Sequence, residues 1–164
     1  MRIAELLYLM APAYLANMTA PFARFWRGWN RPISERWLGS HKTIVGGVAG
    51  ICAALLAAFF QSRIHWRGSI LDYDRWVLLG LLLGVGAIGG DMAKSFVKRR
   101  VKIAPGDRWI PADQLDFGIG ALLLIAPVAG LSWIDAALIL AITFVGDILV
   151  NHVAFRLHIR DTAW

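Results

Sequence analysis

Apolar residues gather into five windows along the chain, and short polar, mostly basic segments separate them. The windows run from Ile3 to Pro21, Thr43 to Phe60, Ile70 to Gly90, Phe117 to Leu131 and Trp133 to Val150. Each is close to the ~20 residues that a helix needs to cross a bilayer, although the fourth is shorter. The pattern therefore predicts an all-α integral membrane protein with about five transmembrane helices.

Composition supports this class. Hydrophobic residues make up 58% of the 164 residues, and the mean hydropathy of +0.57 is above the level of a soluble domain. Five spans leave no room for a separate soluble domain, so we expect residues 1–164 to form a single transmembrane domain. Glu5 interrupts the first window, which we interpret as a mature helix rather than a secretory signal. Cys52 is the only cysteine, which excludes a disulfide within one chain.

The basic residues are distributed unevenly between the predicted loops. Thirteen of the 17 lysines and arginines follow the first, third and fifth windows, and the other four are Arg2, Arg63, Arg67 and Arg75. The positive-inside rule then predicts an N-terminus outside and a C-terminus in the cytoplasm of a multi-pass protein of the cell (plasma) membrane. Topology and anionic membrane lipids explain the net charge of +6, so we expect no nucleic-acid partner.

The segment between the third and fourth windows carries the densest group of charged residues. Asp91, Ser95 and Lys98 recur at i, i+4 and i+7, so on a helix they share one face, with Arg99 beside them. A charge at mid-membrane costs ~2.5–3.5 kcal/mol, so an acidic residue at a window edge needs partners or a water-filled cavity. Lys98, Arg99 and Arg100 can neutralise polyphosphate oxygens; alternatively, they only form a positive-inside loop.

Two further carboxylates follow the Pro105-Gly106 turn. Asp113 and Asp116 stand at i, i+3, a spacing that lets both reach the same ion. Mg²⁺ takes carboxylate oxygens and usually bridges to substrate phosphates. Together with Asp91, the pair predicts a site for a magnesium nucleotide. We expect this site to open to the cytoplasmic surface. The alternative is that the three carboxylates only offset the neighbouring basic residues.

Two other polar groups lie at the predicted cytoplasmic side. His41, Lys42 and Thr43 open the second helix, and a helix N-terminus is a natural anion site, although Ser40 or Thr43 can also serve as a simple cap. Asp147 and Asn151 stand at i, i+4 near the end of the fifth window. They either join the same polar cavity or form a hydrogen-bonded pair between packed helices, and the sequence does not decide between these.

Glycines are concentrated in the third window, at positions 80, 84, 86, 89 and 90. Small residues let membrane helices approach closely, and this is the first interpretation. The second is that Gly89-Gly90 clears space for a ligand beside Asp91. A phosphate-binding loop of the soluble nucleotide-binding kind is not expected, because neither its residue pattern nor its strand-turn-helix context is present.

The central segment resembles a known family. The order Asp91, Ser95, Lys98-Arg99, Pro105-Gly106 and Asp113-Gln114-Leu115-Asp116 is similar to the signature of the CTP-dependent phosphatidate cytidylyltransferases. The short five-helix form with Lys98-Arg99-Arg100 resembles its archaeal-type branch, CDP-archaeol synthase. His41 to Thr43 and the closing Arg160 to Trp164 match that branch more loosely. Thr162-Ala163 stands where a proline is expected, and Asp147 where the family more often has a histidine.

The resemblance implies transfer of CMP from CTP to a membrane lipid phosphate, such as 2,3-bis-O-geranylgeranylglycerol phosphate, with release of pyrophosphate and with Mg²⁺ as cofactor. No side-chain base is required, because a phosphate monoester has a second pKa of about 6 and is already ionised. The candidate catalytic residues are Asp91, Ser95, Lys98, Asp113 and Asp116, of which the three aspartates are also the candidate metal ligands. The candidate substrate-binding residues are His41, Lys42, Thr43, Arg99, Arg100, Gln114 and Asn151.

The sequence is also compatible with other activities. Phosphatidic acid is an alternative lipid substrate, and a small ion-coupled transporter using Asp147 is an alternative class. Acidic residues spread across the membrane depth would favour transport, whereas here they gather toward one side. Prenyltransferases and CDP-alcohol phosphotransferases also use aspartates and Mg²⁺, but their motifs are not found. A homodimer is a possible assembly.

Overall fold

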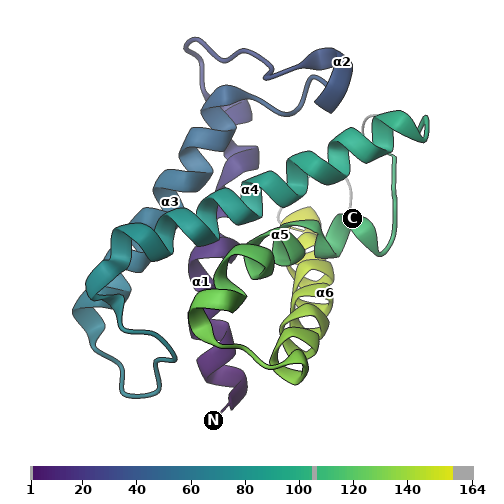
Figure 1. Ribbon diagram of the computed structural model, residues 1–164. Coiled ribbons are helices and arrows are strands. Elements are labelled where there is room, and N and C mark those ends of the chain that lie inside the picture. The colour runs from purple at the N-terminus through teal and green to yellow at the C-terminus, as the bar shows by residue number, and fades with distance from the viewer. Residues whose placement is uncertain (1, 105–106, 157–164) are drawn as a thin grey trace.

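The computed structural model describes residues 2–104 and 107–156, and every regular element in these ranges is a helix (Figure 1). The elements are α1 (Arg2–Thr19), η1 (Ala20–Phe25), α2 (Glu35–Leu38), α3 (Ile44–Ile64), η2 (Tyr73–Arg75), α4 (Trp76–Arg100), α5 (Ala112–Ala129) and α6 (Trp133–Arg156). The all-α prediction is confirmed. The Pro105-Gly106 turn and the closing Arg160 to Trp164 lie outside the described residues.

Four of the described helices are long and apolar enough to cross a membrane: α3, α4 together with η2, α5 and α6. α1 is not among them, and it contains Arg2, Glu5 and Pro12. The assignment to integral membrane proteins therefore holds. The count of five spans and the orientation in the membrane stay predictions.

The helices that carry charged residues extend beyond the apolar windows. α4 does not end at Gly90 but continues to Arg100, and α5 begins at Ala112 rather than at Phe117. Hydropathy marks the part of a helix that lies in lipid, whereas the backbone hydrogen bonds continue into the polar residues beyond. Both polar extensions are therefore helical, which places Asp91 and Asp116 on rigid elements rather than in loops.

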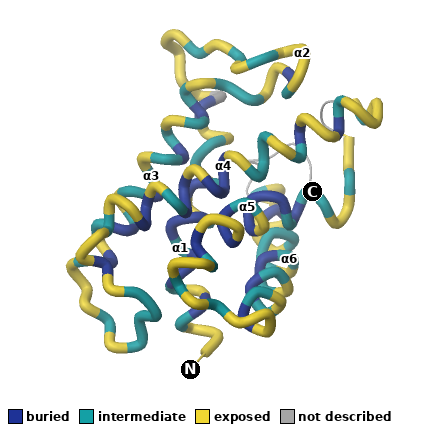
Figure 2. Tube along the Cα trace, in the orientation of Figure 1, coloured by how far each residue is buried: buried dark blue, intermediate teal, exposed yellow. Residues whose placement is uncertain are grey.

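The core lies where α1, α4 and α5 meet. Leu9, Met10, Leu83, Phe117 and Ile125 from these helices are almost completely buried. α4 crosses the other helices, and Figure 2 shows the buried residues gathered along its contacts with α1 and α5. Many large apolar side chains elsewhere are exposed, as expected for helices whose outer faces contact lipid.

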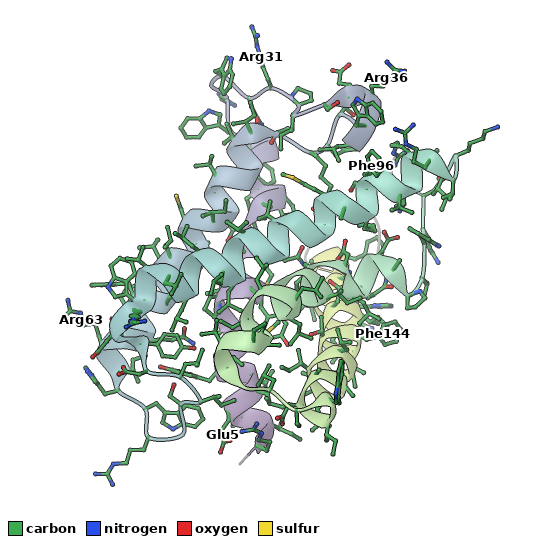
Figure 3. The ribbon with its side chains drawn as sticks, in the orientation of Figure 1. Glu5, Arg31, Arg36, Arg63, Phe96 and Phe144 are labelled. Carbon is green, nitrogen blue, oxygen red and sulfur yellow. The ribbon has the colours of Figure 1, made fainter. Side chains whose placement is uncertain are left out.

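Contacts between distant segments define two ends of the molecule. At one end, the Arg2 guanidinium donates to both carboxylate oxygens of Asp135, over 2.7 and 2.6 Å, which joins the starts of α1 and α6. At the other end, α2, within the segment before α3, lies against the last turns of α4, where Trp37 stacks on Phe96 with 5.6 Å between ring centroids. Figure 3 shows Arg36 and Phe96 near one another, far from Glu5.

Candidate functional site

A cavity of about 580 Å³ lies at the end where α3 begins and α4 finishes. This volume is in the range of known small-molecule sites. Its walls come from the end of α1, η1, the loop before α3, the first turn of α3, α4, the segment before α5, the first turns of α5 and the second half of α6. It brings together eleven of the twelve candidate site residues: His41, Lys42, Thr43, Asp91, Ser95, Lys98, Arg99, Asp113, Gln114, Asp116 and Asn151.

Arg100 is the twelfth candidate, and it does not line this cavity. Its guanidinium lies over the ring of Trp37, 4.1 Å from the centroid, and over that of Phe96 at 4.9 Å. On a helix, the residue after Arg99 points about 100° away from it, which here directs Arg100 to the outer loop. The three groups attach the loop before α3 to the last turns of α4.

Lys94 lies at the centre of the site. From the sequence it counts only as one of the basic residues that predict the orientation in the membrane. Its ammonium is 3.4 Å from Oδ1 of Asp91, 3.0 Å from Oδ1 of Asp113 and 2.9 Å from Oδ2 of Asp116. Three carboxylates from two helices therefore converge on one cation. The signal that could have identified Lys94 is its spacing, i+3 from Asp91 and i−4 from Lys98 on the same helix.

Two further lysines complete the cluster. Lys42 forms an ion pair with Oδ2 of Asp91. Lys98 donates to Oδ1 and Oδ2 of Asp113, over 3.0 and 3.1 Å, and to the backbone carbonyl of Asp107 over 2.5 Å. The three lysines and three aspartates thus alternate in one continuous network, which we call the Lys–Asp cluster. Because it is partly buried, its charges are less screened than those of surface pairs.

Close packing between α4 and α5 sets the spacing of this cluster. A Cβ added at Gly86 would lie 2.7 Å from both Cα of Ala121 and the carbonyl oxygen of Gly120. Neither Gly89 nor Gly90 lines the cavity, and Gly90 instead contacts the backbone of Asp116. These contacts support the helix-packing interpretation of the glycines, because only residues without a side chain allow the two backbones to approach this closely.

The hydroxyl and guanidinium groups along α4 are held by their own helix and by the segment that follows. Ser95 is buried and donates from Oγ to the backbone oxygen of Asp91 over 2.9 Å. Arg99 donates to the backbone oxygen of Ile103 over 2.5 Å. Thr43 caps α3 by accepting from the backbone N–H of Gly46 over 3.2 Å, so its expected capping role is confirmed.

The remaining candidates come from α5 and α6. Gln114 is buried, and its Oε1 makes no hydrogen bond with the described residues, which leaves an acceptor free at the wall of the cavity. Asn151 donates to Oδ2 of Asp147 over 2.8 Å, and both residues line the cavity. The hydrogen bond within α6 and a place in the polar cavity are therefore compatible.

The cluster contains carboxylate oxygens, which are the donors that hard divalent ions take. As the side chains stand, no three His, Cys, Asp or Glu groups among the described residues surround a common metal position. The oxygens of Asp91, Asp113 and Asp116 nevertheless already converge on the single ammonium of Lys94. Carboxylate oxygens are the ligands that Mg²⁺ prefers, so these three residues are the ones that could hold such an ion.

The chain is similar to several known proteins over nearly its whole length. It is 34% identical to the CDP-archaeol synthase of Methanospirillum hungatei over 166 residues, covering 94% of this chain and 100% of that one. It is 35% identical to the CDP-archaeol synthase of Sulfurisphaera tokodaii, with 99% and 96% covered.

A solved structure shares this fold. It is described as an intramembrane enzyme for archaeal membrane lipid biosynthesis, and it superposes with a TM-score of 0.69 at 30% sequence identity. The superposition covers 91% of this chain and 94% of that chain. The family model for CarS-like CDP-archaeol synthases matches residues 2–164. With the helical membrane fold and the Lys–Asp cluster described above, the chain belongs to the CarS-like CDP-archaeol synthase family.

Proposed function

We propose that this protein transfers CMP from CTP to an archaeol-type lipid phosphate, giving a CDP-lipid and pyrophosphate. The observation that carries the proposal is the convergence of Asp91, Asp113 and Asp116 on one cation inside a cavity that basic side chains also line. A magnesium nucleotide needs this combination, because its metal takes carboxylate ligands while its phosphates take basic ones. Membership of the family agrees with this chemistry.

In the proposed reaction, an oxygen of the lipid phosphate attacks the α-phosphorus of CTP. A new P–O bond forms, the bond between the α-phosphorus and the bridging oxygen breaks, and pyrophosphate leaves with that electron pair. The attacking phosphate is already ionised near neutral pH, so no side chain has to remove a proton. The protein's part is to align the two phosphates and to neutralise their charge.

The basic residues of the cavity would bind the triphosphate. Lys98 is 7% exposed at the side chain and lies between Asp113 and the backbone of Asp107, where it can act as a fixed point charge. Arg99 and Lys42 line the same cavity and extend the positive surface toward the loop before α3. Arg99 can bind phosphate oxygens through two N–H groups, which adds orientation to charge neutralisation.

Asp91, Asp113 and Asp116 would hold Mg²⁺, which when bound supplies positive charge to the α-phosphate and the departing pyrophosphate. Asp116 is the most deeply placed of the three, with 4% of its side chain exposed. Its Oδ1 also accepts from the backbone N–H of Phe117 over 2.6 Å, which fixes the carboxylate on α5. Asp113 is held in the same way by the backbone N–H of Trp109, over 2.6 Å.

The lipid phosphate would enter from the side of the cavity formed by α1, η1 and α3. Small or apolar residues line that side, among them Ala20, Pro21, Gly46 and Gly47, and Ile88 of α4 lies next to Gly47. A phosphate headgroup there would lie next to the basic cluster, with its hydrocarbon chains along the exposed apolar faces of the helices. We place this end at the cytoplasmic surface of the cell membrane, because the basic loops gather there and CTP is cytosolic.

A direct assay tests the proposal. Purified protein is incubated with labelled CTP, Mg²⁺ and one lipid phosphate at a time: an archaeol-type ether lipid phosphate, phosphatidic acid or a polyprenyl phosphate. We expect lipid-linked CMP and pyrophosphate with the archaeol-type substrate. Product only with phosphatidic acid would change the lipid and keep the reaction. No lipid-linked CMP with any substrate would overturn the proposed enzyme activity and would favour a transporter.

A further inference from the structure

We propose that Lys94 is an exchangeable internal cation, which holds the three carboxylates together before substrate binds and releases them to the metal only when the nucleotide arrives. Lys94 would then be a positioning residue that makes the binding of divalent metal and CTP interdependent. This inference deepens the proposed function and depends on it. The ammonium of Lys94 lies between the three carboxylates, where the proposed metal ion would bind.

The geometry shows why Lys94 competes with a metal ion. Its ammonium lies 2.9 to 3.4 Å from one oxygen of each of Asp91, Asp113 and Asp116. A divalent ion shared by the same oxygens must take a position close to that of the ammonium, and the two cations would repel each other strongly over so short a distance. The lysine therefore has to leave before all three carboxylates can bind the metal.

The charges of the Lys–Asp cluster are balanced without a ligand. Lys42, Lys94 and Lys98 match three aspartates, and each of the five pairings between them is an ion pair within 3.4 Å. A metal ion that binds alone adds two positive charges to this partly buried group and leaves a displaced ammonium without its carboxylates. Such unpaired buried charge is unfavourable, so the metal alone should bind weakly.

The nucleotide removes this penalty. The triphosphate brings several negative charges, and a displaced Lys94 can pair with a phosphate oxygen, because it lines the same cavity as Lys98 and Arg99. The flexible stem of a lysine allows its ammonium to move while the helix stays in place. Metal and CTP therefore favour each other's binding, and by linkage each must raise the affinity for the other by the same factor.

The test measures binding of Mn²⁺ rather than turnover. Mn²⁺ binding to purified protein in detergent is followed by electron paramagnetic resonance without any nucleotide, in the wild type and in Lys94→Met. We expect the variant to bind Mn²⁺ alone about tenfold or more tightly, because the competing ammonium is gone. Lys94→Arg keeps the positive charge and should retain weak binding. Arg27→Met removes an exposed positive charge from the loop before α3 and serves as the matched control.

Two outcomes with these variants would overturn the inference. The first is equal Mn²⁺ affinity in Lys94→Met and the wild type, and the second is equally tight binding in Lys94→Met and Lys94→Arg. Lys94→Met leaves Asp116 without a lysine partner, while Asp91 and Asp113 keep Lys42 and Lys98. Because a buried unpaired carboxylate is unfavourable, the variant is expected to fold poorly in EDTA, so it is purified with Mn²⁺ before dialysis. Folding that depends on Mn²⁺ in this variant alone would support the exchange.

The wild type gives a test that needs no variant. CTP without lipid substrate should raise the affinity of the protein for Mn²⁺ by about tenfold or more, after correction for Mn²⁺ bound by CTP in a protein-free titration. Equal affinity with and without CTP would overturn the coupling. These results are separable from the proposed function: lipid-linked CMP formation without coupling would remove only the role of Lys94, whereas coupling without any lipid product would remove the proposed reaction.

Discussion

Gly90 of α4 lies directly against the backbone of Asp116 on α5. A Cβ built at Gly90 would overlap the carbonyl oxygen of Asp116 and lie 3.0 Å from its carbonyl carbon. Lys94, one turn further along α4, forms its 2.9 Å ion pair with the side chain of the same aspartate. The helix contact and the charged cluster are therefore parts of one arrangement, in which the absence of a side chain at one position sets the place of a carboxylate.

This relationship predicts unequal effects at two neighbouring glycines. Gly90→Ala should push α5 away and lower kcat by about a hundredfold, since a displacement of about 1 Å in a catalytic site can have an effect of this size. Gly89→Ala should keep wild-type activity, because nothing lies within 4 Å of an added Cβ there and alanine favours the helix. CDP-lipid synthesis by the two purified variants measures the difference, and equal activities would contradict the explanation.

The carboxylates of the cluster make a second prediction. Asp91→Asn and Asp116→Asn should each abolish turnover, because each removes a charged oxygen proposed to hold Mg²⁺, while helical content measured by circular dichroism stays unchanged. Asp74→Asn, in η2 at the opposite end of the molecule, is the control and should remain active. Wild-type rates in both cluster variants would contradict a metal-binding role and would indicate that these aspartates only offset the neighbouring basic residues.

A third prediction separates neighbouring basic residues on α4. Lys98→Ala should raise the KM for CTP about tenfold or more, because it removes a nearly buried charge from the cavity wall. Arg99→Ala should act in the same direction. Arg100→Ala should change that KM much less, since its guanidinium lies over Trp37 outside the cavity. Steady-state kinetics with varied CTP measure the KM of each variant. An equal increase in KM in all three variants would contradict the conclusion that only the residues lining the cavity bind CTP.

A fourth prediction concerns metal dependence. Activity should vanish in EDTA and return with Mg²⁺ or Mn²⁺, both of which accept oxygen ligands in a compact shell. Ca²⁺ should restore it poorly, because its larger and looser shell does not enforce the alignment that displacement at the α-phosphate requires. The rate of CDP-lipid formation in each ion is the measurement. Full activity in EDTA would contradict a metal site at the three aspartates.

A fifth prediction tests the orientation in the membrane. In a Cys52→Ala background, cysteines placed near Arg27 and Lys102 should react with a membrane-impermeant reagent from the cytoplasm, and one near Arg67 from outside. The structure places the loop before α3 and the end of α4 together, since Lys42 pairs with Asp91. Labelling of the positions near Lys102 and Arg67 from the same side would be incompatible with the predicted topology.

The membrane class, the order of the long helices and most of the candidate residues could be read from the sequence. Hydropathy and the i, i+4, i+7 spacing are local properties, so they determine which residues share a helix face without any knowledge of the partner helix. For this reason the spacing predicts a shared face for Asp91, Ser95 and Lys98, with Arg99 beside it, and all four line the cavity. Helix ends were less accurate, because apolarity reports the bilayer and not the hydrogen-bonded length of α4 and α5.

The partners of these residues were decided only by the tertiary structure. Lys94 and Arg100 look alike in the sequence, as basic residues near the end of one helix, yet one binds three carboxylates and the other lies over aromatic rings. The direction in which α5 and the loop before α3 approach α4 makes that difference, and this direction depends on long-range contacts such as Gly90 against Asp116. Local spacing fixes the face of a helix, whereas the charge that each face meets depends on the packing of segments far apart in the chain.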